Sequence, residues 1–222
     1  MTHLENAMQT IQDLTRKDTM YYGNIPVFIY QITYPSFTTT CSTSSAQKIN
    51  DYYAQTAKRM EAYSRTVLYA QAVENARYIP SGKPPFNSYT FDSKYKVTYN
   101  EKCISSLYTE TYTYMGGAHG ETKRTSDTWD FHTGARLQLN DVYPLTRATL
   151  RTMQSALEQQ AASGLEENPG SYFDDYKALL QKNFHRNSFY IQPGAVVIYY
   201  QQYDIAPYST GLPEFYLPLH LT

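Results

Sequence analysis

The residues with the clearest chemical potential lie in one glycine-rich stretch, Tyr112-Thr-Tyr-Met-Gly-Gly-Ala-His-Gly120. Its histidine is a residue type that serves as a general acid or base and as a ligand contact. A phosphate-binding loop would need a helix N-terminus and a lysine directly after the glycines. Here Glu121-Thr122-Lys123 leads into a strand pattern, so we reject phosphate binding.

His119 has no catalytic motif around it. Neither a G-x-S-x-G elbow nor an H-E-x-x-H pattern occurs, and the other four histidines are scattered along the chain. The acidic pairs Glu166-Glu167 and Asp174-Asp175 are more simply solvated residues than a glycosidase pair. We therefore assign no catalytic residue, no metal site and no cofactor, and His119 is either a hydrogen-bonded loop residue or a direct ligand contact.

A second stretch, Tyr203-Asp-Ile-Ala-Pro-Tyr-Ser-Thr-Gly-Leu-Pro-Glu-Phe215, is a proline-punctuated loop between two strand patterns. Asp204 and Tyr208 can present polar groups from such a rigid loop, or the loop simply covers the end of a sheet. Both stretches together supply our expected ligand-binding residues. These are Tyr112, Tyr114, Gly116, Gly117, His119, Asp204 and Tyr208.

Composition narrows the class of partner. The 24 tyrosines against a single tryptophan suit half-buried sheets, and they also suit faces that bind sugars or proteins. Lys plus Arg number 19 and Asp plus Glu 20, so the net charge of -1 gives no field to attract nucleic acid. No apolar run approaches the roughly 20 residues of a membrane-spanning helix, and residues 1–18 lack the pattern of a secretory signal.

Two cysteines, Cys41 and Cys103, are too far apart for a CxxC redox or zinc element. In an oxidising compartment they can form a disulfide whose loop closure stabilises the fold by about 4 kcal/mol. The alternative is two buried thiols that act as small hydrophobic side chains.

The positions of apolar residues predict the elements. Leu4, Met8, Ile11 and Leu14 have helical spacing, so we expect an N-terminal helix or linker over residues 1–24. A strand follows over residues 26–34, and an apolar series at steps of three and four predicts a long helix that starts near Ser44 and ends near Arg77.

Four strands in two hairpins are expected next, over residues 95–99, 103–114, 123–131 and 136–139, with one turn at Asn100-Glu101 and one at Gly134, where glycine supplies a positive φ. Two shorter helices are predicted over residues 147–162 and 172–182. Two strands are expected on either side of Pro193-Gly194, and the alternation of Phe215, Leu217 and Leu219 predicts a last strand. This order predicts an α+β fold with antiparallel sheets. We expect an N-terminal subdomain over residues 25–120 and a C-terminal one over residues 121–222.

Three segments resemble the RsiV-like family of bacterial extracytoplasmic domains. They are Gly116-Gly-Ala-His-Gly120, Trp129-Asp-Phe-His-Thr-Gly-Ala-Arg-Leu-Gln-Leu-Asn-Asp-Val-Tyr143 and the loop over residues 203–215. The family includes the outer domain of the lysozyme-sensing anti-sigma factor RsiV and a non-catalytic region of the peptidoglycan deacetylase PdaC. The resemblance implies an α+β fold, an extracytoplasmic location in a bacterium, and binding related to the cell envelope. Sigma-factor binding and deacetylation do not carry over, because the chain shows neither an anti-sigma region nor a deacetylase domain.

The leading hypothesis is a non-enzymatic domain that binds a cell-wall glycan or a lysozyme-like protein through its tyrosine-rich surface. The alternative is a hydrolase acting on envelope glycan or peptide, with His119 as acid or base. That alternative predicts a concave pocket that holds His119 beside a carboxylate. A third possibility is a purely structural spacer.

Overall fold

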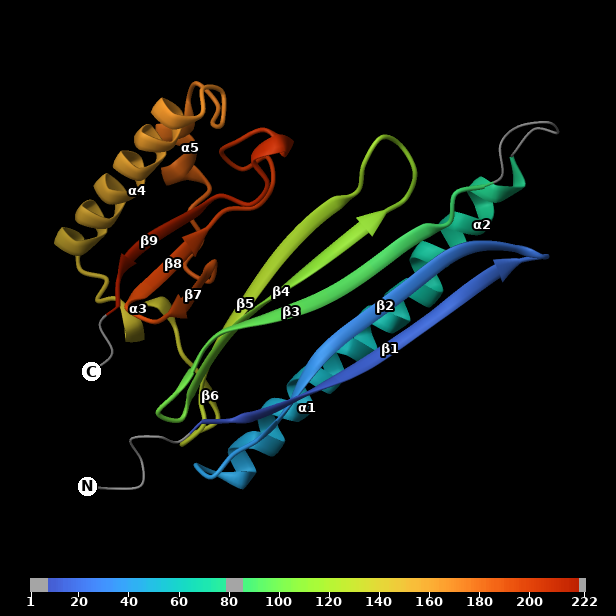
Figure 1. Ribbon diagram of the computed structural model, residues 1–222, viewed down its shortest axis with the longest axis horizontal. Coiled ribbons are helices and arrows are strands. Elements are labelled where there is room, and N and C mark those ends of the chain that lie inside the picture. The colour runs from blue at the N-terminus through green and yellow to red at the C-terminus, as the bar shows by residue number, and fades with distance from the viewer. Residues whose placement is uncertain (1–7, 79–85, 220–222) are drawn as a thin grey trace.

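The computed structural model describes residues 8–78 and 86–219, which form two β-sheets with helices packed against them (Figure 1). The large sheet has the strand order β1-β2-β3-β4-β5-β6 and the small sheet the order β7-β8-β9. The large sheet contains β1 (Thr10–Tyr22), β2 (Ile25–Thr38), β3 (Tyr89–Glu101), β4 (Ile104–Tyr114), β5 (Glu121–Asp130) and β6 (Ala135–Arg136). The small sheet contains β7 (Phe189–Gln192), β8 (Ala195–Tyr199) and β9 (Glu214–Pro218). The α+β class predicted from the sequence is confirmed.

One long helical rod covers the large sheet. It consists of α1 (Thr43–Tyr63), a π-helical turn η1 (Ser64–Leu68) and α2 (Tyr69–Arg77), and it runs along β1 and β2 (Figure 1). Ile49 and Tyr53 are buried as the apolar periodicity predicts, but Val67 is exposed and Leu68 is buried in its place. The shift is already present at Ser64, which is buried while Tyr63 is exposed, and the buried positions then repeat at steps of four through Leu68 and Ala72 to Ala76, whereas the predicted series includes steps of three.

The N-terminal helix predicted over residues 1–24 is wrong for the described residues, because Thr10–Tyr22 is the edge strand β1. Two of its inward positions carry charges: Arg16 bonds to Glu61 at 2.6 Å, and Asp18 bonds to Arg65 at 2.7 Å. Inward-pointing charges are typical of edge strands, and here they hide the alternation of apolar residues that marks a strand.

The large sheet is mixed, whereas we had expected antiparallel sheets. β2 pairs with β3 in parallel, with Phe28 opposite Tyr89, while its other pairs are antiparallel. The long rod is the connection between β2 and β3, and a helical crossover of this kind brings two strands together in parallel. The sheet also continues past Gly120, our predicted subdomain boundary, into β5 and β6.

Two further layers, the small sheet and the helices that cover it, pack on the opposite face of the large sheet. In it, α4 (Arg147–Glu167) and α5 (Tyr176–Lys182) cover the small sheet, and the short α3 (Leu139–Val142) links them to β6. The apolar core between these helices and the small sheet includes Met153, Leu157 and Phe215. The other face of the small sheet meets the large one, where Tyr190 and Tyr199 pack near Tyr108 of β4.

One disulfide and one glycine conformation match what the sequence allowed us to expect. Cys41, just before α1, forms a disulfide with Cys103 in the β3–β4 turn, and Cys103 is fully buried. Gly134 in the β5–β6 turn has a φ of +65°, the positive value that this hairpin was expected to need. Within the described residues, no helix combines the length and apolar character required to cross a bilayer.

Candidate functional site

The two distinctive loops of the sequence meet in space. The ring of His119 stacks on Tyr208 with centroids 3.9 Å apart, and Tyr203 lies 6.1 Å from Tyr208. Tyr203 is 54% exposed, and His119 is also exposed. We call His119, Tyr203 and Tyr208 the aromatic loop cluster. It is an exposed aromatic surface assembled from residues far apart in the chain.

The glycine loop is fixed by the tyrosines of β4. Tyr112 Oη accepts a hydrogen bond from the amide of Gly120 at 3.2 Å, and Tyr114 Oη donates one to the carbonyl of Gly117 at 3.2 Å. A Cβ at Gly120 would lie 2.5 Å from the Tyr112 ring and 2.6 Å from the Thr113 carbonyl, so no other residue fits there without a shift. Tyr112 and Tyr114 thus position the loop that carries His119.

Asp204 has a structural role in the second loop. Its carboxylate accepts a hydrogen bond from the amide of Gln201 at 2.8 Å, and its carbonyl accepts one from the Asn183 side chain at 2.6 Å. These bonds hold the turn that presents Tyr203, whose φ is +67°. The predicted ligand-binding residues are therefore brought together, but Asp204 supports the cluster by holding this turn with its carboxylate and its carbonyl.

The surroundings of His119 differ from those that the hydrolase alternative requires. Nδ1 of His119 lies 3.1 Å from the carbonyl oxygen of Gly120, and the face of the ring is covered by Tyr208. No carboxylate pairs with His119 among the residues that the structure describes. The described part of the chain also contains no group of His, Cys, Asp and Glu arranged to hold a metal ion.

A groove of about 490 Å³ lies along β5, between α1 and the segment that precedes β7. We call it the interlayer groove, and sequence reasoning assigned it no role. Its walls come from α1, β5, β6, the segment before β7, and the end of β8 with the residues that follow it. The lining residues are Tyr52, Thr56, Arg59, Met60, Arg124, Thr125, Ser126, Asp127, Arg136, His185, Asn187, Ser188, Tyr199 and Gln201.

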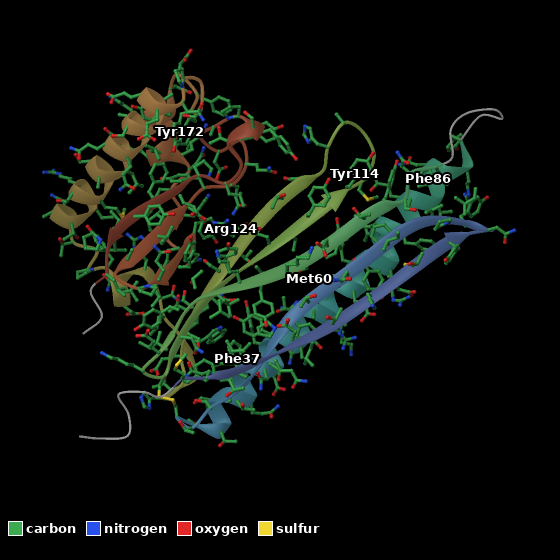
Figure 2. All side chains as sticks on the ribbon, in the orientation of Figure 1. Phe37, Met60, Phe86, Tyr114, Arg124 and Tyr172 are labelled. Carbon is green, nitrogen blue, oxygen red and sulfur yellow. A yellow bond between two sulfur atoms is a disulfide. The ribbon has the colours of Figure 1, made fainter. Side chains whose placement is uncertain are left out.

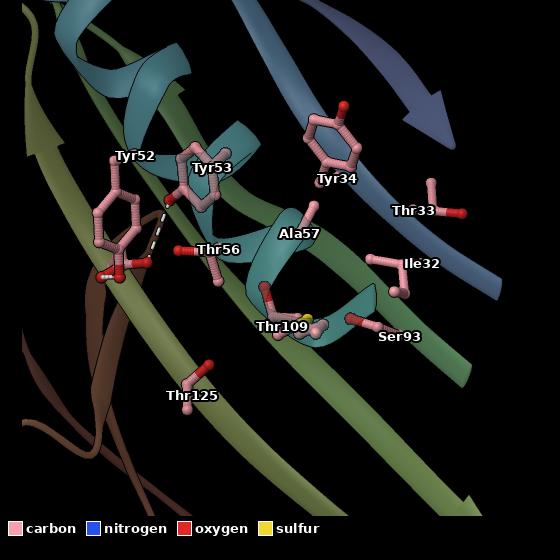
Figure 3. Close-up of a pocket in the computed structure, with 12 residues that line it drawn as sticks. Ile32, Thr33, Tyr34, Tyr52, Tyr53, Thr56, Ala57, Ser93, Thr109 and Thr125 are labelled. Carbon is pink, nitrogen blue, oxygen red and sulfur yellow. Dashed lines mark hydrogen bonds between the residues drawn. The ribbon is translucent and has the colours of Figure 1, made fainter. Parts of the chain in front are cut away.

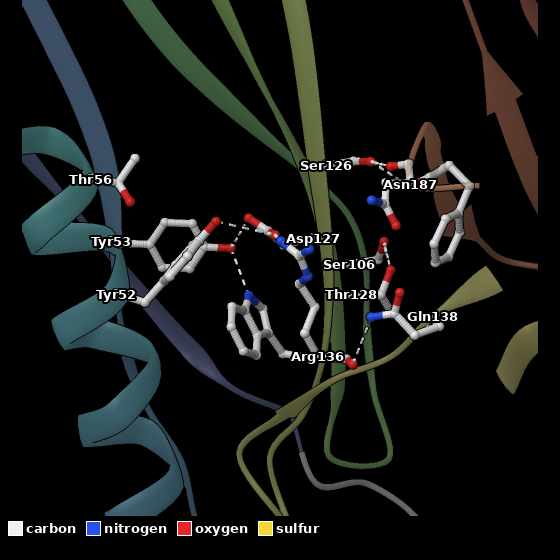
Figure 4. A network of polar contacts seen from close by, with 12 residues as sticks. Tyr52, Tyr53, Thr56, Ser106, Ser126, Asp127, Thr128, Arg136, Gln138 and Asn187 are labelled. Atoms are coloured by element: carbon white, nitrogen blue, oxygen red, sulfur yellow. Dashed lines mark hydrogen bonds and ion pairs between the residues drawn. The ribbon is translucent and has the colours of Figure 1, made fainter. Parts of the chain in front are cut away.

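Asp127 anchors a polar network in this groove (Figure 4). Its carboxylate accepts hydrogen bonds from Tyr53 Oη at 3.2 Å and from Arg136 Nη1 at 2.8 Å, and Tyr52 Oη lies 3.5 Å away. Burial raises the pKa of Asp127 above its usual range, although the Arg136 guanidinium and the tyrosine hydroxyls favour the charged form. The loss of hydration on burial therefore raises the pKa of Asp127 more than the Arg136 cation lowers it.

On the opposite face of β5, Arg124 ties the two sheets together (Figure 2). Its side chain is only 7% exposed, and its guanidinium lies 4.1 Å from the centroid of the Tyr108 ring. It donates hydrogen bonds to Glu110 of β4 at 2.6 Å and to Glu214 of β9. Arg124 therefore links the two sheets through charge-assisted hydrogen bonds to a carboxylate of each.

A smaller cavity lies between α1 and the large sheet (Figure 3). Its volume is about 30 Å³, and its polar lining includes Ser93, Thr109 and Thr125 from three adjacent strands. A space of this size and polarity holds one or two water molecules. It is too small for a sugar or a peptide, so the groove and the aromatic loop cluster are the stronger candidates for ligand binding.

The fold and these surfaces define a two-sheet α+β domain with ligand-sized surface features. Comparison with family models then assigns two regions. Residues 23–122 match the model described as Deacetylase PdaC, and residues 138–220 match the model of a protein family of unknown function, DUF3298. Together the matches support an uncharacterised family of PdaC/DUF3298 type.

Solved structures share the fold. A DUF3298 family member from Bacteroides fragilis has a TM-score of 0.66 at 20% identity, covering 96% of this chain and 92% of its own. A DUF3298 family protein from Pseudomonas aeruginosa has a TM-score of 0.61 at 20% identity, covering 97% of this chain and 92% of its own. At this identity the likeness establishes the fold alone. A search of curated proteins gave no match.

Proposed function

We propose that this chain is an extracytoplasmic bacterial domain that binds a cell-envelope glycan or a protein such as lysozyme, without catalysing a reaction. The match of residues 23–122 to the PdaC model supports an extracytoplasmic location, as does the resemblance to RsiV-like domains. The Cys41–Cys103 disulfide agrees with it, because such bonds persist mainly in oxidising compartments.

The observation that carries the proposal is the meeting of His119 and Tyr208 beside the exposed Tyr203. Aromatic rings with polar tips bind both sugar faces and protein surfaces at a low cost in conformational entropy. Both loops are held by hydrogen bonds of Tyr112, Tyr114 and Asp204, so the cluster is preorganised.

Binding without catalysis fits the geometry of His119 better than acid–base chemistry does. A general base must reach the proton that it abstracts, and it is usually oriented by a third group. The histidine here is stacked on Tyr208, and its Nδ1 faces the carbonyl of Gly120. This is the packing of a positioned contact residue.

The test is a titration of the protein against c-type lysozyme, with solubilised peptidoglycan fragments in parallel. We expect saturable binding of one of them, weakened about tenfold by Tyr203→Ala. Tyr78→Ala is the matched control, because Tyr78 is 75% exposed at the end of α2. Lysozyme binding would support a sensor, and glycan binding alone would support wall attachment. If neither ligand bound, or if Tyr203→Ala and Tyr78→Ala lost affinity equally, the proposal would be refuted.

A further inference from the structure

The floor of the interlayer groove is the outer edge of β5. Neighbouring residues of an antiparallel strand point their backbone groups alternately toward each side. The amide of Arg124 points outward to the Gln201 side chain, and the carbonyl of Thr128 points outward to the amide of Leu137. Ser126 lies between them, so its N–H and C=O also point outward, and they have no partner among the described residues.

The neighbouring residue shows what fits such an edge. The Gln201 amide accepts a hydrogen bond from Arg124 N at 2.9 Å and donates one to Arg124 O at 2.7 Å. It occupies the place of an adjacent strand. One residue of an extended peptide would satisfy Ser126 in the same way, because its own N–H and C=O point to the same side. The single amide of an N-acetyl sugar cannot form both bonds, since its N–H and C=O point in opposite directions.

The charges of the groove favour an anionic ligand. Arg136 is paired with Asp127, and Arg124 is paired with Glu110 and Glu214. Arg59 contacts only the hydroxyl of Thr56, at 2.8 Å, and it has no carboxylate partner among the described residues. An arginine fork of this kind suits a carboxylate.

We propose that the interlayer groove binds a short extended peptide that pairs with the backbone of Ser126 and places a carboxylate near Arg59. A volume of about 490 Å³ accommodates a ligand of this size. Peptides add to exposed sheet edges in this manner in several recognition domains. The site shares no residue with the aromatic loop cluster, so it is independent of the function proposed above.

The experiment follows backbone amide signals of the labelled protein by NMR while acetyl-Ala-Ala-Glu is added. We expect saturable shifts at residues 125–127. Ser126→Pro removes the outward N–H without removing a bond to β4, and we expect it to weaken binding about fivefold to tenfold. Ser126→Ala is the matched control: it loses the same hydroxyl, whose partners are Asn187 O, Phe189 O and Tyr199 Oη, but keeps the N–H.

A second variant keeps the test decisive if Ser126→Pro fails to fold. Arg59→Gln changes an exposed side chain, and we expect it to weaken binding about threefold, as does replacing the probe by acetyl-Ala-Ala-Gln amide. Tyr203→Ala leaves peptide binding unchanged, which separates this site from the aromatic loop cluster. The absence of saturable shifts, unchanged binding in Arg59→Gln, or the same shifts with an N-acetylglucosamine trimer would overturn the proposal.

Discussion

At the residue scale, β5 carries two buried charges that are stabilised to different degrees. Arg124 has two carboxylates and an aromatic face around it. Asp127 has one guanidinium and two tyrosine hydroxyls, and burial raises its pKa in spite of them. Both charges lie where the layers meet, so the ionisation of one side chain affects the packing of whole elements.

Asp127 gives a prediction about pH. Because burial raises its pKa, the folded state binds a proton more tightly than the unfolded state does. Its ionisation therefore lowers stability above the folded-state pKa, and this loss is relieved as the pH falls through that pKa. We expect the wild type to gain free energy of unfolding relative to Asp127→Asn between pH 7 and about pH 4.

Urea unfolding of both proteins across this range measures the difference, with Asp51→Asn as a control at an exposed position of α1. A wild type that instead becomes less stable relative to Asp127→Asn as the solution is acidified would show that the pKa of Asp127 is lowered, and that Arg136 dominates over burial.

Arg124 gives a prediction about the joint between the sheets. Arg124→Ala leaves Glu110 and Glu214 without their cation and removes the contact with Tyr108, so we expect a loss of about 3 kcal/mol in the free energy of unfolding. Arg124→Lys keeps the charge but not the fork, and we expect a smaller loss. Chemical denaturation measures both. The exposed neighbour Lys123→Ala is the control, and an equal effect there would contradict the assignment.

At the element scale, side-chain amides act as substitutes for neighbouring strands. Each of them donates to the C=O and accepts from the N–H of the same backbone residue. Unpaired strand edges invite association with other chains, and these amides occupy such positions. The pairs are Asn50 with Phe37, Asn100 with Gln9, Gln201 with Arg124, and Gln160 with Tyr216.

The pair at β9 is the most direct to test. Gln160 of α4 forms both bonds to Tyr216, each at 2.9 Å, and β9 is an edge strand of the small sheet. We expect Gln160→Ala to lower the free energy of unfolding by about 1–2 kcal/mol and to promote self-association at high concentration. Denaturation and analytical ultracentrifugation measure these effects. The exposed neighbour Gln159→Ala should show neither, and a monomeric Gln160→Ala of normal stability would refute the role.

At the scale of the whole molecule, the predictable features are those that local pattern determines. The periodicity from Ile49 onward predicted the long helix, and the turn at Gly134 predicted the second hairpin. The strand β1 was missed because Arg16 and Asp18 occupy inward positions that an apolar pattern cannot reveal. The parallel pairing of β2 with β3 follows from the crossover, which only the complete chain path shows.

The candidate sites were also only partly predictable from the sequence. Glycines and prolines marked both loops of the aromatic loop cluster, but the stacking of His119 on Tyr208 depends on tertiary structure. The interlayer groove draws residues from α1, β5, β6, the segment before β7 and the end of β8, and no stretch of sequence contains more than a part of it. Arg136 lies within a motif that the sequence singled out, yet its pairing with Asp127 required the hairpin geometry.

The disulfide gives a prediction about the whole fold. Cys41 and Cys103 close a loop with a sequence separation of 62, which restricts the unfolded chain much more than the folded one. We expect the double variant Cys41→Ala/Cys103→Ala to lose about 4 kcal/mol of unfolding free energy. Urea unfolding with and without reductant measures this loss, and reductant should destabilise the wild type alone. If reductant left the wild type as stable as before, the bond would contribute nothing, and its support for an extracytoplasmic location would be withdrawn.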